Sequence, residues 1–189
     1  MTRISVEVGY DVVPYHDPAV TETDKILIKR AAEARMNAYA PYSNFWVGVA
    51  LLGECGNYSW GCNAEVATYS QCSHAEQVGI CNLITKKGPT KIRQLALVGA
   101  PEVSKILVPP QPVNMLSEKE PDKVCWPCGH CRQIIWEYCQ SDKRIRIVSL
   151  HPRGFVFIST IGDLYPFAFG PDDLGIDLKR YKDKTGRAL

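Results

Sequence analysis

Apolar residues along the chain recur with two periods, one typical of helices and one typical of strands. Residues 23–38 carry an apolar face at helical spacing, with Thr21 or Thr23 available as the cap and Pro41 beyond the end. Two further helices are predicted at 74–86 and 127–139. Short, largely apolar runs bounded by turn residues predict five strands, at 45–52, 58–62, 92–99, 145–150 and 155–159.

The order of these elements predicts the fold class. Strands alternate with helices, with one hairpin early and another late, which is typical of an α/β fold. We expect a three-layer α/β/α sandwich with a mixed central sheet. Gly48 inside the first strand predicts that another element packs close to its backbone. Residues 100–124 contain five prolines and little periodicity, and are predicted to form a long loop.

Length and charge narrow the classes of function. The chain has 189 residues, which suits one domain with extensions, and a formal net charge of only +2. This balance argues against a strongly phosphate-binding surface, and the basic segment 177–187 is interpreted as a solvated tail. No apolar run is long enough to span a membrane and the first 22 residues do not form an apolar signal segment. We therefore expect a soluble, cytoplasmic protein with reduced cysteines.

Two separated motifs carry the candidate chemistry. Residues 74–76 read His-Ala-Glu, and residues 127–131 read Pro-Cys-Gly-His-Cys. His74, Cys128 and Cys131 supply three ligands for a tetrahedral Zn²⁺ and leave the fourth position to water, as in catalytic zinc sites. Glu76 is free to move protons. This pairing of H-x-E with P-C-x-x-C is the signature of zinc-dependent nucleobase deaminases.

The local structure around these residues supports a shared site. Cysteines three residues apart on a helix face the same side, and Pro127 suits the first turn of that helix. His74 begins a different helix, so two positively polarised helix N-termini are expected to meet at the metal. Two thiolates and a neutral imidazole would leave a formally neutral zinc centre, consistent with the uncharged Gln77.

Other interpretations of these residues remain open. His74 could be a capping or core histidine and the cysteines small apolar residues. Cys125 is a rival ligand, although it precedes the helix, and His130 is expected to point away from the shared face. The remaining cysteines are interpreted as reduced packing residues: Cys55, Cys62, Cys72, Cys81 and Cys139.

From these residues outward, residues 23–174 resemble the cytidine deaminase family. The matching segments, in the same order as in the family, are 45–48 (FWVG), 61–65 (GCNAE), 74–76 (HAE), 127–133 (PCGHCRQ) and 168–171 (AFGP). The His ligand followed by Gln77 is more similar to the dimeric bacterial type than to the small tetrameric enzymes. The resemblance implies a deaminase domain at 23–174, an N-terminal extension at 1–22 and a C-terminal tail at 175–189.

The resemblance implies zinc-dependent hydrolytic deamination of cytidine and deoxycytidine, in pyrimidine salvage, with Glu76 shuttling protons to the ring and the leaving amine. It also implies substrate contacts: Asn63 and Glu65 with the ribose, Phe45 with the base, and the backbone of Ala75 and carbonyl of Trp126 with the base edge. From the sequence alone, Asn63 and Glu65 would be turn residues and Phe45 a core residue. Phe167 or Phe169 is expected to reach an active site, which could belong to a neighbouring subunit.

The chain departs from the family at several positions. Trp126 stands where a small residue is expected, Val66 where Asn is usual, and the segment 100–124 is longer than its family counterpart. The chain has a single motif set, without the second, degenerate half that accompanies the dimeric type, so neither subfamily fixes the oligomeric form. The resemblance implies a homodimer or a homotetramer, because family active sites borrow residues across interfaces. If Trp126 and the long loop 100–124 reshape the pocket, the alternative is a deaminase of a modified cytosine nucleoside such as an aminoacyl-nucleoside antibiotic. A polynucleotide deaminase would need a basic groove with stacking aromatics, and a non-catalytic binding module would not need Glu76.

Overall fold

A computed structural model describes residues 7–101, 108–111 and 124–178, which contain one six-stranded sheet with the order β1-β6-β5-β4-β2-β3. The strands are β1 (Asp11–Pro14), β2 (Trp46–Gly53), β3 (Tyr58–Cys62), β4 (Ile92–Ala100), β5 (Arg146–Leu150) and β6 (Phe155–Thr160). The helices are α1 (Glu22–Arg35), α2 (Ala75–Lys87), α3 (Gly129–Tyr138) and the short α4 (Ile161–Leu164). Single 3-10 turns occupy Tyr69–Gln71 and Pro171–Leu174.

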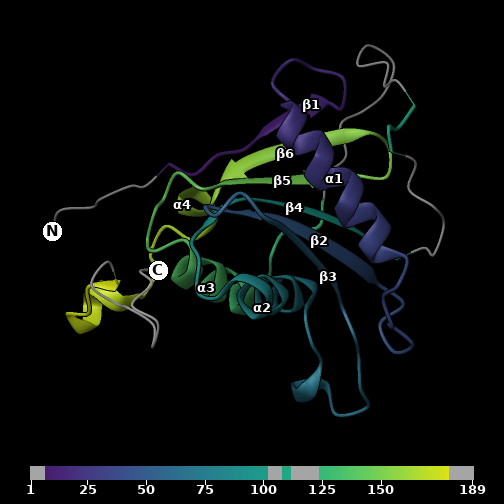
Figure 1. Ribbon diagram of the computed structural model, residues 1–189. Coiled ribbons are helices and arrows are strands. Elements are labelled where there is room, and N and C mark those ends of the chain that lie inside the picture. Colours follow the sequence, from purple (N-terminus) through teal and green to yellow (C-terminus); the bar gives the residue numbers. More distant parts are fainter. Residues whose placement is uncertain (1–6, 102–107, 112–123, 179–189) are drawn as a thin grey trace, which may run out of the picture.

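The sheet is mixed, as predicted. β4 and β5 pair in parallel, whereas the pairs β1–β6, β2–β3, β2–β4 and β5–β6 are antiparallel. Helix α1 covers one face, and α2 and α3 lie side by side on the other (Figure 1). The three-layer α/β/α architecture predicted from the sequence is therefore confirmed.

Each face of the sheet has its own core, and β4 contributes to both through the strand period of two. Leu95 and Leu97 pack with residues of α2 and α3, while Ala96 and Val98 pack with residues of α1. Gly48 of β2 lies against α1, where an added Cβ would clash with the Ala31 carbonyl oxygen. The close approach predicted at this glycine is thus confirmed, and α1 is the element that makes it.

The helix boundaries differ from the prediction at α1, which begins at Glu22 and ends at Arg35, three residues before residue 38. Thr21 caps its start, and Asp24 completes a capping box, so Thr21 is the cap rather than Thr23. The helix ends early because Tyr39 leaves it to form a β-bridge with Ala64.

We predicted no regular element before residue 23, yet Asp11–Pro14 forms β1 at the edge of the sheet. It pairs with β6 from Asp11 opposite Ile158 to Pro14 opposite Phe155. A proline is tolerated at the end of an edge strand because no neighbour needs its missing N–H. Of the long loop predicted at 100–124, residues 102–107 and 112–123 lie outside the described residues, as does most of the tail predicted at 175–189.

Candidate active site

Two helix N-termini meet at the predicted metal site. His74 is the N-cap of α2, Cys128 is the N-cap of α3, and Cys131 is the third residue of α3. Helix α3 therefore starts two residues later than predicted, and Pro127 precedes its cap instead of lying in its first turn. The reason is the extended backbone of Cys128 (φ −68°, ψ 170°), which is the usual conformation of a capping residue.

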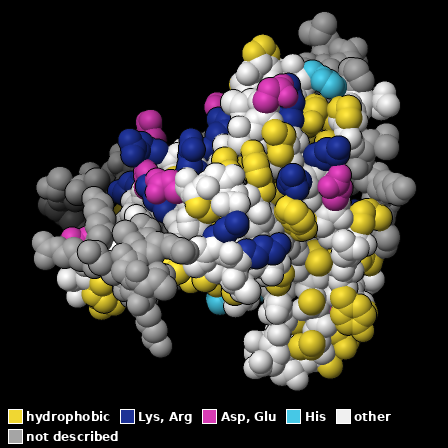
Figure 2. All heavy atoms as spheres, viewed as in Figure 1, with side chains coloured by type: hydrophobic (Ala, Val, Ile, Leu, Met, Phe, Trp, Pro, Cys, Tyr) yellow, Lys and Arg dark blue, Asp and Glu magenta, His cyan; other side chains and the backbone are white. Residues whose placement is uncertain are grey.

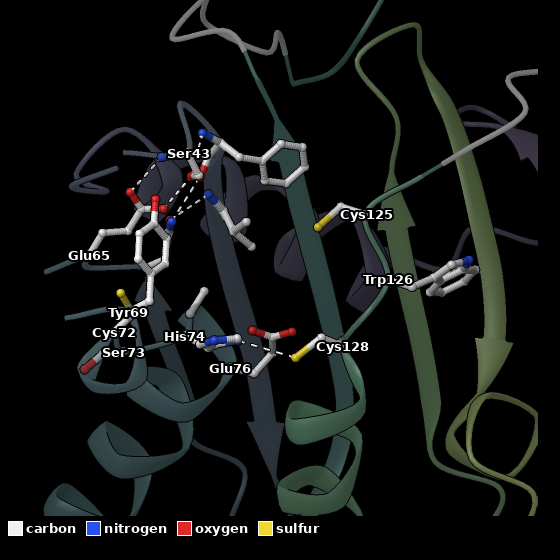
Figure 3. A pocket seen from close by; sticks show the side chains of 14 residues that line it. Ser43, Glu65, Tyr69, Cys72, Ser73, His74, Glu76, Cys125, Trp126 and Cys128 are labelled. Atoms are coloured by element: carbon white, nitrogen blue, oxygen red, sulfur yellow. Dashed lines mark hydrogen bonds between the residues drawn. The ribbon is translucent and has the colours of Figure 1, made fainter. Parts of the chain in front are cut away.

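The three predicted ligands converge on one point. Nδ1 of His74 lies 3.4 Å from Sγ of Cys128 and 3.3 Å from Sγ of Cys131, and all three ligand atoms lie within 4.8 Å of one another. One imidazole and two sulfurs at this spacing suit a tetrahedral zinc ion with one position left open. His74 and Cys128 face each other at one end of a pocket (Figure 3).

Glu76 lies beside this cluster in the first turn of α2. Its side chain is only 5% exposed, and its carboxylate points into the space between His74 and Cys128 (Figure 3). Burial raises the pKa of Glu76 above the usual carboxyl range, which hydrogen bonding and the nearby histidines only partly offset. A buried carboxyl with a raised pKa is suited to accepting and returning protons.

Neither Cys125, the rival ligand, nor His130 is part of the ligand cluster. Cys125 packs against Gly99 of β4, and burial raises the pKa of its thiol to about 12. His130 was expected to point away from the site, but its ring contacts His74 edge-on at a centroid distance of 5.7 Å. The first turn of α3 brings His130 close to the first turn of α2, so His130 flanks the cluster without joining it.

The pocket beside the cluster has a volume of about 340 Å³, within the range of small-molecule sites. All of the predicted site residues line it except Cys131, which is buried behind it. The structure adds lining residues that were not among the predicted site residues: Ser43, Val47, Tyr69, Cys72, Ser73 and Cys125. Phe167 and Phe169, by contrast, do not line this pocket and are 80% and 56% exposed.

The two residues predicted to bind ribose are held by the chain around them. Asn63 accepts a hydrogen bond from the Val47 N–H at 2.8 Å and donates one to the Phe45 carbonyl at 2.9 Å. The Glu65 carboxylate accepts hydrogen bonds from the N–H groups of Tyr42 (3.0 Å) and Ser43 (3.1 Å) and from the Ser43 hydroxyl. Burial alone would raise the pKa of Glu65, but these hydrogen bonds outweigh it and lower the pKa.

Trp126, whose bulk departs from the family pattern, does not fill the pocket with its ring. The indole points away from His74, Glu76 and Cys128 (Figure 3) and packs edge-on against Phe157 of β6 at 6.2 Å. Trp126 nevertheless lines the pocket, so its main chain borders the pocket while the ring lies outside it. The pocket shape consequently stays open at the position where Trp126 departs from the family.

Two further observations concern the cysteines and the helices of the described residues. All eight cysteines lie within the described residues and all are free thiols. Among the described helices, none has the length and apolar character needed to cross a membrane.

Comparison with known proteins agrees with this site. A family model described as the cytidine and deoxycytidylate deaminase zinc-binding region matches residues 21–148. A cytidine deaminase from Sporosarcina psychrophila is 34% identical over 148 residues, which cover 78% of this chain and 92% of that protein. The match to a longer cytidine deaminase, from Actinobacillus pleuropneumoniae, is 29% identical and covers 78% of this chain but 40% of that protein.

Solved structures give the same result. The crystal structure of cytidine deaminase from Burkholderia pseudomallei matches with a TM-score of 0.59 and 32% identity, covering 79% of this chain and 99% of that one. The Mycobacterium tuberculosis enzyme matches with a TM-score of 0.55 and 31% identity, covering 77% and 95%. With the converging His-Cys-Cys cluster and the buried Glu76 beside it, these matches show that the chain belongs to the zinc-dependent cytidine deaminase family.

Proposed function

We propose that this protein hydrolyses cytidine and deoxycytidine to the corresponding uracil nucleosides, with release of ammonia. The observation that carries the proposal is the arrangement of one pocket with two chemically different ends. A buried carboxyl, Glu76, and a zinc-ligand set lie at one end, and Glu65, held by Ser43, lies at the other (Figure 3). Asn63 lines the same pocket. The base of a cytosine nucleoside, with its exocyclic amine, matches the end with Glu76 and the ligand set, and the sugar matches the other end.

His74, Cys128 and Cys131 would hold the zinc ion, which when bound acts as a Lewis acid that activates water. Glu76 accepts a proton from the attacking water and delivers it to N3 of the cytosine ring. C4 thereby becomes electrophilic and adds the water oxygen. The C4 hydroxyl of the adduct then gives its proton to Glu76, which carries it to the exocyclic nitrogen. The C4–N bond breaks, the C4 carbonyl forms, and ammonia leaves. A positioned carboxyl of this kind typically contributes about 10²- to 10⁴-fold to the rate.

Substrate positioning is assigned to the remaining pocket residues. Phe45 packs on the base, and the backbone of Ala75 and the carbonyl of Trp126 contact the base edge. Asn63 and Glu65 bind the sugar hydroxyls. The low pKa of Glu65 supports its role because an ionised carboxylate is a stronger hydrogen-bond acceptor than a neutral acid.

The alternative substrate, a modified cytosine nucleoside, rested partly on Trp126 reshaping the pocket. Because the Trp126 ring packs outside the pocket, this residue gives the alternative no support. The ordinary nucleoside is therefore the function that the described residues favour.

The test is an assay of deamination by the purified, zinc-loaded protein, in which the change in ultraviolet absorbance is recorded. We expect conversion of cytidine and deoxycytidine. Cytidine monophosphate should react poorly, since the Lys and Arg side chains of the described residues do not line the pocket. Failure to convert either nucleoside while zinc remains bound would overturn the proposal.

A homo-oligomeric, cytoplasmic enzyme is part of the same proposal. Exposed apolar side chains gather on the lobe that carries the loop between β3 and α2 (Figure 2), where Val66 and Tyr69 are 43% and 63% exposed. Exposed apolar patches of this kind mark protein interfaces. Free thiols throughout the chain support a reducing compartment.

A further inference from the structure

The segment before β1 reaches the back of the active-site wall. Tyr10 contacts the Trp126 ring at a centroid distance of 6.2 Å and an interplanar angle of 61°, and contacts Phe157 at 5.6 Å. Trp126 and Phe157 contact each other at 6.2 Å and 86°. Three rings from the N-terminal segment, β6 and the pocket wall therefore form one closed cluster, in the tilted and edge-on arrangements that aromatic rings prefer.

The position of Tyr10 in this cluster is fixed by the sheet. Asp11, the next residue, opens the β1–β6 ladder opposite Ile158, and the Gly9 carbonyl accepts a hydrogen bond from the Ser159 hydroxyl at 2.8 Å. Hydrogen bonds on both sides of Tyr10 thus tie its backbone to β6. Its ring is held over Phe157, which is itself 2% exposed.

The same stretch of wall is held from two other directions. The Ser149 hydroxyl of β5 donates a hydrogen bond to the Cys125 carbonyl at 2.7 Å, and the Cys125 side chain packs against Gly99 of β4. The Cys125 carbonyl belongs to the peptide that joins residues 125 and 126, so these contacts fix that peptide. Beyond it, Nε of Arg132 donates a hydrogen bond to the Pro127 carbonyl at 2.7 Å. Between these two anchors, the contacts of the Trp126 ring with Tyr10 and Phe157 add a third point of support at residue 126 itself.

We propose that Tyr10 is a positioning residue for the nucleoside site: by holding the Trp126 ring outside the pocket, it fixes the main chain that borders the base. The inference rests on the proposed function, since it concerns substrate binding at that site. Residues 9–14 then stabilise this stretch of the pocket wall in addition to extending the sheet. Tyr10 makes no contact with substrate and acts only through Trp126.

The test compares KM and kcat for cytidine in Tyr10→Ala, Tyr10→Phe, Trp126→Ala and the double variant Tyr10→Ala/Trp126→Ala. Tyr10→Ala should raise KM about two- to tenfold, the range expected for losing one aromatic cluster member, with kcat and zinc content unchanged. Tyr10→Phe should keep the wild-type KM, because the ring rather than the hydroxyl makes the contacts. In the Trp126→Ala background, removing Tyr10 should have no further effect on KM.

Val8→Ala is the matched control, since Val8 is an exposed residue of the same segment and should leave KM unchanged. An unchanged KM in Tyr10→Ala, or an equal rise with and without Trp126, would overturn the proposal. If the wild type does not convert cytidine, the proposed function fails instead. The aromatic cluster is then tested by near-ultraviolet circular dichroism, where a Tyr10→Ala spectrum identical to that of the wild type would contradict it.

Discussion

The hydroxyl of Ser43 donates a hydrogen bond to the carboxylate of Glu65, across a gap of 22 residues in the chain. The N–H groups of Tyr42 and Ser43 bind the other carboxylate oxygen, so three donors from one turn hold Glu65 in a single orientation. Ser43 also lines the pocket. The end of the pocket proposed to bind the sugar is therefore built by this turn as much as by Glu65 itself.

Replacing Ser43 with Ala should loosen the Glu65 carboxylate without removing it. We expect KM for cytidine to rise about three- to tenfold, since one hydrogen bond to a charged group is lost while two main-chain donors remain. The pKa of Glu65 should rise, because its low value depends on the Ser43 hydroxyl. Ser70→Ala, an exposed serine in the nearby 3-10 turn, is the control. Steady-state kinetics with an unchanged KM would argue against a sugar contact for Glu65.

The exchange Glu76→Gln removes the proposed proton carrier and keeps the shape of the side chain. Turnover should fall by about 10²- to 10⁴-fold, because the amide cannot accept and return a proton. Zinc content and thermal stability should remain close to the wild type. Normal turnover in this variant would rule out Glu76 as the proton shuttle.

Cys128→Ala tests the ligand set directly by metal analysis of the purified protein. Losing one of three protein ligands should reduce bound zinc to a small fraction of one equivalent. Cys125→Ala is the matched control, since Cys125 lies three residues earlier but outside the ligand cluster. We expect it to keep a full equivalent of zinc, and loss of metal from this variant would make Cys125 a ligand.

Asp24 combines two structural roles in α1. It is fully buried, completes the capping box with Thr21, and accepts hydrogen bonds from Arg146 of β5 at 2.9 and 3.1 Å. Asp24→Ala should lower the free energy of unfolding by about 3 kcal/mol, since a charged partner is left behind. Glu22→Ala removes only an exposed ion pair with Lys25, and should cost less than about 1 kcal/mol. Equal urea midpoints for the two variants would contradict this difference.

Asp142 gives the protein a pH-dependent contribution to stability. Hydrogen bonds from Arg144 and Lys91 hold the pKa of Asp142 well below its usual range. A lowered pKa stabilises the fold above the unfolded value of about 3.9, and this stabilisation is lost as the pH falls below it.

Asp142→Asn should therefore lower the free energy of unfolding by about 1 kcal/mol at pH 7, because Arg144 is largely exposed. The difference from the wild type should shrink below about pH 4. Urea unfolding across this pH range measures it, with the exposed Asp172→Asn as control. A difference that grows on acidification would have the wrong sign for this mechanism.

The sequence predicted those parts of the fold that depend on local pattern. The strand at 58–62 agrees with β3 to the residue, because Gly56 and Asn57 mark the turn that precedes it. Strand β1 was missed because its four residues, ending in Pro14, carry no pattern of their own and are stabilised by β6, more than 140 positions later. Pairing between such distant segments cannot be read from local periodicity.

The site residues likewise differ in whether a local sequence pattern could indicate them. The convergence of His74, Cys128 and Cys131 could be predicted because zinc chemistry imposes residue types and a fixed spacing on two short motifs. Ser43 was missed because a serine in a loop is an ordinary turn residue until the fold brings Glu65 to it. The orientation of Trp126 depends on Tyr10 and Phe157, which are far from it in the chain.

The parallel pairing of β4 with β5 has a consequence for how this chain tolerates change in length. Parallel neighbours cannot be joined by a hairpin, so the chain between Ala100 and Arg146 must cross over the sheet, and this crossover carries α3 (Figure 1). The strands set their register among themselves, from Gln94 opposite Arg146 to Val98 opposite Leu150. Residues added ahead of α3 therefore leave that register unchanged, and doubling such a connection costs only about 0.6 kcal/mol of chain entropy. The crossover connection is thus the place where residues can be inserted beside the active site with the smallest loss of stability.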